Sequence, residues 1–165
     1  MTDEKKQEFT LRISRANRTE MTVIIYEIAQ EYVREAIDVL DGGFVEGQTQ
    51  VSELERYNRA VRNAGMCIDT LKSTLDFTYP LSGTLLHLYI SMKKQLARAI
   101  AGRNPKHLDI VLDGLKELAD AFRKVAEADD SAPLYENSQD VTAGYTYGKS
   151  GVNVNPEMTG RGFLA

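Results

Sequence analysis

The sequence predicts an all-α protein: an antiparallel up-down four-helix bundle with an irregular N-terminal lead and a Gly/Tyr-containing C-terminal tail. Four long segments carry apolar residues at helical spacing, and short breaks that contain Gly or Pro separate them. Helices of similar length joined by short loops pack most simply as antiparallel neighbours. We therefore divide the 165-residue chain into a lead over residues 1–17, a bundle over 18–128 and a tail over 129–165.

The first predicted helix covers residues 18–40. Asn17 is a suitable N-cap, and Glu20 stands three residues later, where its side chain can accept a hydrogen bond from the cap's own N–H. Gly42 and Gly43 end the helix. Its apolar stripe consists of Met21, Ile24, Ile25, Ile28, Tyr32, Ala36 and Leu40.

The second predicted helix covers residues 51–75. Gly65 interrupts it at a position where another helix can approach closely. Tyr79 and Pro80 then break the chain, because the residue before a proline is pushed out of the helical region. The apolar stripe of this helix consists of Val51, Leu54, Val61, Ala64, Ile68, Leu71 and Leu75.

The third predicted helix, residues 82–101, is apolar on more than one side. Such a helix is either central in the fold or keeps a surface for a partner. One face holds Leu85, Leu88, Tyr89, Met92, Leu96 and Ala99, whereas Leu81, Leu86 and Ile90 lie off that face. The fourth helix covers residues 105–128, with Pro105 at its entry. Its single stripe consists of Leu108, Val111, Leu112, Leu115, Leu118, Ala119, Phe122 and Val125.

The two ends of the chain show a different pattern. Apolar residues alternate at Phe9, Leu11 and Ile13 in the lead, which indicates extended structure. The tail has no helical stripe, and Tyr145 and Tyr147 alternate there in the same way. Each end is either a loose terminus or a segment that docks on the bundle.

Composition excludes several classes of function. The net charge of -4 argues against nucleic-acid binding, which needs a basic face toward the phosphates. The single cysteine, Cys67, cannot form an intrachain disulfide and suits a reducing compartment. The polar start predicts no signal peptide, and no apolar run approaches the about 20 residues of a membrane span. We therefore expect a cytoplasmic protein that contacts neither membrane nor nucleic acid.

The sequence holds no constellation of catalytic or metal-ligating residues, so we predict that the protein is not an enzyme and needs no cofactor or metal. The residues three before His87 and His107 are Thr84 and Asn104, so the Glu-x-x-His pattern of di-metal bundles is absent. No phosphate-binding loop, Cys-x-x-Cys pair or nucleophile elbow occurs. Cys67, beside Ile68, is interpreted as a small core residue.

Four pieces of the bundle together resemble a known family. The first helix contains Ile25-Tyr26-Glu27 followed by Ala29, and the second ends with the pattern I-x-x-L-x-x-x-L-D that closes on Leu75 and Asp76. Tyr89 belongs to an L-x-x-L-Y-x-x-M pattern in the third helix, and the fourth helix carries Ala121 and Phe122 toward its end. In this order, over residues 17–126, these pieces are similar to the FliS-type flagellar export chaperones. The family-motif residues are Tyr26, Glu27, Leu75, Asp76 and Tyr89.

The resemblance implies a client and a partner. FliS-type proteins bind the C-terminal region of flagellin in the cytoplasm, prevent its premature polymerisation and aid its type III flagellar export. The chain is accordingly expected to bind a flagellin C-terminal segment, with an export-gate component as a possible second partner, and to be a monomer or a weak dimer. The lead or the tail is a candidate cover for the binding groove.

The expected client groove is the outer apolar surface of the second to fourth helices. The client-binding candidates are Leu71, Leu75, Leu81, Leu86, Tyr89, Ile90 and Met92. Core packing is the favoured interpretation for Leu85, Leu88, Tyr89 and Met92 together, whereas Leu81, Leu86 and Ile90 are expected to be more exposed because they lie off the main stripe. Three alternatives stay open: another helical secretion chaperone or regulatory protein-binding module, an enzyme or metal carrier built in a bundle, and a structural protein that dimerises through its apolar faces.

Overall fold

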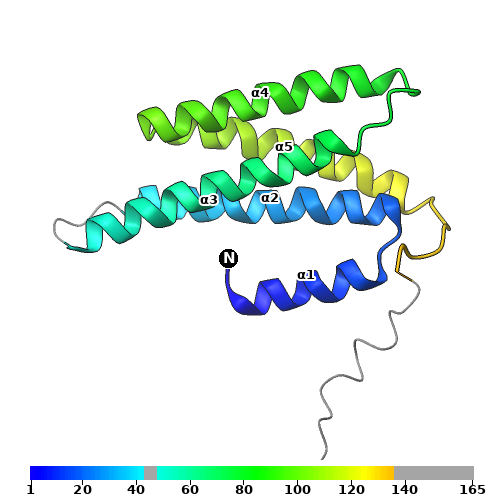
Figure 1. Ribbon diagram of the computed structural model, residues 1–165, viewed down its shortest axis with the longest axis horizontal. Coiled ribbons are helices and arrows are strands. Elements are labelled where there is room, and N and C mark those ends of the chain that lie inside the picture. Colours follow the sequence, from blue (N-terminus) through cyan, green and yellow to red (C-terminus); the bar gives the residue numbers. More distant parts are fainter. Residues whose placement is uncertain (43–47, 136–165) are drawn as a thin grey trace, which may run out of the picture.

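The computed structural model describes residues 1–42 and 48–135, and over these ranges the chain is helical without strands. The all-α prediction is confirmed. Figure 1 shows the elements and their order. The helices are α1 (Asp3–Arg15), α2 (Arg18–Asp41), α3 (Gln48–Ser73), α4 (Leu81–Gly102) and α5 (Pro105–Ala126). The last four correspond to the four predicted helices, with ends that differ by up to three residues.

The four long helices pack side by side, and α1 is added on the outside. Helix α2 contacts both α3 and α5, and α4 contacts the same two helices from the other side. The Tyr57 hydroxyl of α3 donates to Ala99 O near the end of α4, at 2.8 Å, and ties these two helices together. Gln30 Nε2 in α2 donates to Leu115 O in α5 at 3.3 Å. Helix α1 lies along α2, on the side away from α4 (Figure 1).

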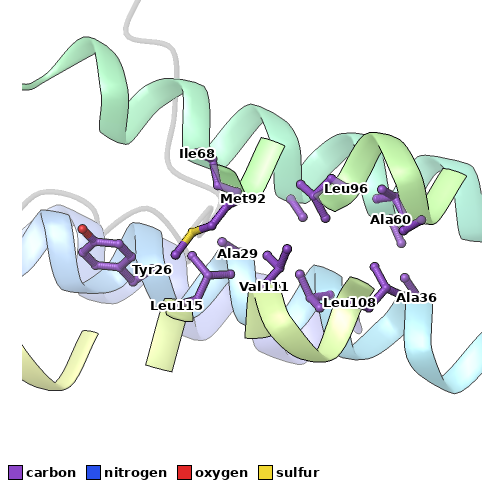
Figure 2. Packing of buried hydrophobic residues seen from close by; sticks show 14 of the residues in the cluster. Tyr26, Ala29, Ala36, Ala60, Ile68, Met92, Leu96, Leu108, Val111 and Leu115 are labelled. Carbon is purple, nitrogen blue, oxygen red and sulfur yellow. The ribbon is translucent and has the colours of Figure 1, made fainter. Parts of the chain in front are cut away.

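The hydrophobic core fills the space between α2, α3, α4 and α5 (Figure 2). The predicted stripes of α3, α4 and α5 supply most of this core, because residues three and four apart share one face of a helix, but their members Val51, Leu88 and Val125 are exposed. The predicted stripe of α2 is largely wrong. Its Met21, Ile24 and Ile28 pack with α1, whereas the core takes the face with Tyr26, Ala29, Val33, Ala36 and Val39. Figure 2 labels part of this core: Tyr26, Ala29, Ala36, Ala60, Ile68, Met92, Leu96, Leu108, Val111 and Leu115. The hydroxyl groups of Tyr26 and Tyr89 share a hydrogen bond inside it, so neither buried hydroxyl lacks a partner.

Two glycines make room for side chains of α4. A Cβ added at Gly65 would lie 3.2 Å from Lys93 Nζ, which donates to Gly65 O at 3.2 Å. A Cβ at Gly114 would lie 2.7 Å from Met92 Cε. The predicted close approach at Gly65 is confirmed, and the approaching group is the Lys93 side chain.

The predicted irregular lead is wrong, because residues 3–15 form helix α1. Thr2 caps its start, and the acidic and basic residues lie in the first and last turns, where the helix dipole favours them. Phe9 and Ile13 are four residues apart and pack against α2, whereas Leu11 points away and is exposed. The alternation of Phe9, Leu11 and Ile13 therefore does not reflect a strand. The residues that pack against α2 are Phe9, Ile13 and Ala16, which are spaced by four and three residues as in a helix.

The segment after α5 turns back toward the corner between α1 and α2. Asn17 Nδ2 donates to Asp129 O at 3.1 Å, and Leu134 N donates to Ala16 O at 3.0 Å. This corner therefore fixes the path of the chain up to Tyr135. The rest of the tail, including Tyr145 and Tyr147, lies outside the described residues.

The predicted capping box at the start of α2 is confirmed. Asn17 Oδ1 accepts from Glu20 N at 2.8 Å, and Glu20 Oε2 accepts from Asn17 N at 2.9 Å. Asn17 is buried, so its side chain serves both as the helix cap and as the anchor of Asp129.

Replacement of Asn17 with alanine is expected to lower the free energy of unfolding by about 1–2 kcal/mol, because the cap and the Asp129 contact are lost together. Urea denaturation followed by circular dichroism measures this change. The matched control is Asn104→Ala, which removes only the exposed cap of α5, where Asn104 Oδ1 accepts from Lys106 N at 3.0 Å. A loss for Asn17→Ala no larger than for the control would contradict the anchoring role.

Candidate client-binding site

An apolar pocket of about 550 Å³ lies at the end of the molecule where α3 ends and α4 begins. The first turns of α2 and the last turns of α5 form its other walls. Leu71, Leu85 and Tyr89 are buried and form the floor, whereas the rim carries Tyr79, Leu81 and Val125. The full lining is Thr19, Thr22, Leu71, Thr74, Leu75, Asp76, Tyr79, Leu81, Ser82, Leu85, Tyr89, Ala121, Phe122 and Val125.

The rim is unusually apolar for a surface in contact with water. The exposed fractions of Tyr79, Leu81 and Val125 are 66%, 61% and 57%. Single exposed apolar residues are normal on a protein surface, but a group of them around a concave apolar pocket marks a binding site. A pocket of about 550 Å³ has room for apolar side chains of another polypeptide.

The link between α3 and α4 holds the rim in place. Asp76 Oδ1 accepts from Thr78 N at 2.9 Å and from Thr78 Oγ1 at 2.7 Å, as in a turn closed by an aspartate side chain. These bonds, first that from the Thr78 backbone, lower the pKa of the Asp76 carboxyl. Ser82 Oγ donates to Asp76 O at 2.5 Å and fastens the start of α4 to the same turn. The turn therefore presents Tyr79 and Leu81 next to each other at the pocket edge.

The structure separates the predicted client-binding residues into groups. Leu71, Leu75, Leu81 and Tyr89 line the pocket together. Leu86 is half-buried and Ile90 is exposed, and both lie outside the pocket on α4.

Leu71, Tyr89 and Met92 are buried in the core and do not lie on an outer surface. For Tyr89 and Met92 this agrees with the core packing favoured from the sequence, whereas for Leu71 the expected outer position is wrong. The reason for the burial is that α4 packs against both α3 and α5, so its main stripe is sealed by helix contacts. Leu71 and Tyr89 still form the pocket floor, whereas Met92 packs beneath Gly114.

Sequence reasoning did not assign most of the pocket lining to a binding site, including Tyr79, Phe122 and Val125. Tyr79 was interpreted only as part of a chain break, and Phe122 and Val125 only as part of a core stripe. The available signal for Tyr79 was an aromatic side chain directly before Pro80, in a turn that has no core to fill. Nothing in the apolar stripe of α5 indicates that Val125, in the last turns of this helix, lies at the pocket rim and not in the core.

The family-motif residues of α2 connect the helices around this end. Tyr26 meets Tyr89 hydroxyl to hydroxyl, and burial raises the pKa of both phenols. Glu27 accepts from Arg12 of α1, at 2.6 Å, and from Arg123 of α5, at 3.0 Å. Tyr26 thus joins α2 to α4, and Glu27 joins it to α1 and α5.

Helix α1 covers a separate apolar strip of α2. Phe9 packs over Ile24, with Ile13, Met21 and Ile28 around them. Arg12 adds the ion pair with Glu27. The contact between α1 and α2 is small, because Phe9 is the only large side chain that α1 buries.

Catalytic or metal-ligating groups are not assembled in the described ranges. No group of three His, Cys, Asp or Glu side chains there can hold a metal ion. His87 Nδ1 lies 2.7 Å from Gly83 O, and His107 Nδ1 lies 2.8 Å from Gln95 Oε1. None of the helices in residues 1–42 and 48–135 has the length and apolarity to span a membrane.

Cys67 lies in a small groove between α2 and α3, and burial raises the pKa of its thiol from 9.0 to about 11. As the pH rises, the thiol of the unfolded chain ionises before the buried thiol of the folded protein. The stability that depends on the protonated buried thiol is therefore complete below pH 9 and is lost as the pH rises toward 11. Over this window the unfolding free energy of the wild type should fall more steeply than that of Cys67→Ala. Urea denaturation at several pH values tests this, and parallel curves would contradict the burial of the thiol.

These features define a helical domain whose candidate site is an apolar pocket at one end of the packed helices. The family model described as flagellar protein FliS matches residues 1–129. The chain therefore belongs to the FliS family of flagellar chaperones, and the resemblance seen in the sequence is confirmed. No curated protein matches the sequence.

Proposed function

We propose that this protein is a cytoplasmic export chaperone that binds the C-terminal segment of flagellin, prevents its premature polymerisation and aids its type III flagellar export. The observation that carries the proposal is the pocket with Tyr79, Leu81 and Val125 on its rim, in a chain that belongs to the FliS family. The four long helices serve as an antiparallel scaffold that keeps this pocket open.

The physical logic is that of coupled folding and binding. A free flagellin segment with apolar helical faces associates with other copies, whereas a chaperone offers those faces a complementary surface. Ordering the client costs about 2–5 kcal/mol of the gross interaction energy, so the contact must extend beyond a single pocket. Burial of the apolar rim contributes about 25 cal/mol for each Å² removed from water. Binding alone holds the client, so no nucleotide is required.

Helix α1 is part of this function as a removable cover. It protects Ile24 and its neighbours on α2 through one large buried side chain and a few ion pairs at the surface. Exposed ion pairs contribute little, about 0–1 kcal/mol each. A client helix with a larger apolar face therefore competes for the same strip of α2.

Isothermal titration of the full chain with a synthetic flagellin C-terminal segment tests the proposal. Binding at micromolar concentration or tighter is expected, with a negative heat-capacity change from apolar burial. A scrambled segment of the same composition is the control. Absence of binding by the native segment would favour another helical secretion chaperone or a regulatory module with a different client.

A further inference from the structure

Charge is divided unevenly along the sequence. Residues 56–108, which include most of α3 and all of α4, contain nine Lys and Arg but only two Asp and Glu. The remaining residues contain eleven Lys and Arg against twenty-two Asp and Glu. Helices α3 and α4 pack next to each other, so a chain with net charge -4 carries a strongly basic side. Figure 1 shows α4 on the part of the molecule opposite α1, with α3 between them in this view.

Most of the exposed cations on this side have no acidic partner. Among the described residues, Arg59, Arg62, Lys94 and Arg98 are exposed and form no ion pair. On the other helices a larger share of the cations is paired: Arg12, Arg34 and Arg123 each bind a nearby glutamate or aspartate, whereas Arg15, Arg18 and Lys124 form no ion pair within the described ranges. Both acids within residues 56–108 are already engaged: Asp69 binds Lys72 and Lys93, and Asp76 closes its own turn.

An exposed apolar side chain lies among these cations. Ile90, Lys94 and Arg98 are spaced by four residues and therefore share one face of α4. Ile90 is 40% exposed, outside the pocket and on the outer side of its helix. On α3, Arg59 and Arg62 are three residues apart and share an exposed face, which also carries Glu55. Met66 of the same helix lines the groove between α2 and α3 with Ile28 and is not part of this surface.

We infer that the outer faces of α3 and α4 form a second docking surface, which binds an acidic protein helix with apolar residues among its carboxylates. The free cations supply attraction and orientation, whereas Ile90 supplies apolar contact. A nucleic acid fits less well, because a few cations and an apolar side chain do not make a phosphate-binding track. Ile90, Lys94, Arg98, Arg59 and Arg62 line neither the flagellin pocket nor the strip of α2 beneath α1, so the inference is independent of the proposed client.

A fluorescence anisotropy titration of the full chain tests the surface with a defined probe. The probe is a labelled helical peptide of about 20 residues that repeats Glu-Glu-Leu-Ala, and the control peptide repeats Gln-Gln-Leu-Ala. The test variant is Arg62→Glu/Lys94→Glu/Arg98→Glu. The matched control variant, Arg15→Glu/Arg18→Glu/Lys124→Glu, changes the net charge equally at exposed, unpaired cations on other helices. Circular dichroism checks that both variants fold, and a milder Arg62→Gln/Lys94→Gln/Arg98→Gln variant replaces the test variant if it does not.

The wild type and the matched control variant should bind the acidic peptide, and the affinity should fall as salt screens the charges. The test variant should bind about tenfold or more weakly, and the control peptide should bind no variant well. Saturating flagellin segment should leave acidic-peptide binding unchanged. Equal affinity of the test variant and wild type, an equal loss in the matched control variant, or tighter binding to duplex DNA or phosphatidylserine vesicles than to the peptide would overturn the inference.

Discussion

Tyr26→Ala is expected to lower the free energy of unfolding by about 3–5 kcal/mol, the largest effect of any single substitution considered for this protein. The side chain is fully buried, packs near Tyr89 and Phe122, and provides the partner of the Tyr89 hydroxyl. Its loss leaves both a cavity and an unpaired polar group, in a domain whose total stability is about 5–15 kcal/mol. Urea denaturation with circular dichroism as the readout measures the change.

Two further variants separate the effect of the lost hydrogen bond from that of the lost ring, and both from the effect of changing an exposed residue. Tyr26→Phe keeps the ring and removes only the hydroxyl, so it should cost about 1–3 kcal/mol, because the Tyr89 hydroxyl stays buried without its partner. Ile110→Ala removes an exposed side chain on α5 and should cost about 0.5 kcal/mol or less. Similar losses for Tyr26→Ala and Ile110→Ala would show that Tyr26 does not occupy the core position described here.

Tyr79→Ser/Leu81→Glu is expected to reduce the affinity for the flagellin C-terminal segment by about tenfold or more. Each exposed apolar side chain that a partner buries is worth about 1.5–3 kcal/mol, and a tenfold change in affinity corresponds to about 1.4 kcal/mol. Both side chains are mostly exposed in the free protein, so its stability should change by no more than about 0.5 kcal/mol. Isothermal titration and urea denaturation measure the two quantities.

Ile110→Glu is the matched control for the pocket variant. Ile110 has an exposed fraction of 55%, similar to that of Leu81, but it lies on α5 far along the helix from Ala121 and Val125 of the pocket. It should therefore bind the segment like the wild type. An equal loss of affinity in both variants would mean that the effect comes from general surface hydrophobicity or charge and not from the pocket.

Much of the fold follows from local sequence rules. The capping box at Asn17 and Glu20 and the break at Tyr79 and Pro80 are determined by residues within one or two turns of each other. The core stripes of α3, α4 and α5 also follow in large part, because helical spacing decides which residues share a face. That of α2 does not, because this helix is apolar on two sides and spacing does not tell which side faces the core and which faces α1. Helix α1 was missed because three alternating apolar residues are too few to distinguish a strand from a helix when the caps are not considered.

The candidate site was only partly predictable, because it depends on contacts between distant segments. Periodicity shows that α4 is apolar on two sides, but it does not tell which side other helices cover. Packing decides that Met92 is buried while Ile90, two residues earlier, stays exposed. The pocket itself needs the starts of α2 and α4 to meet the ends of α3 and α5, an arrangement that no single segment encodes.

Hydrogen–deuterium exchange of the full chain, with and without the flagellin C-terminal segment, tests the binding site most directly. The account predicts slower exchange on binding in the last turns of α3 and α5, in the link around Tyr79 and in the first turns of α4. Unchanged exchange in these regions at a saturating concentration of the segment, or protection confined to other parts of the chain, would contradict it.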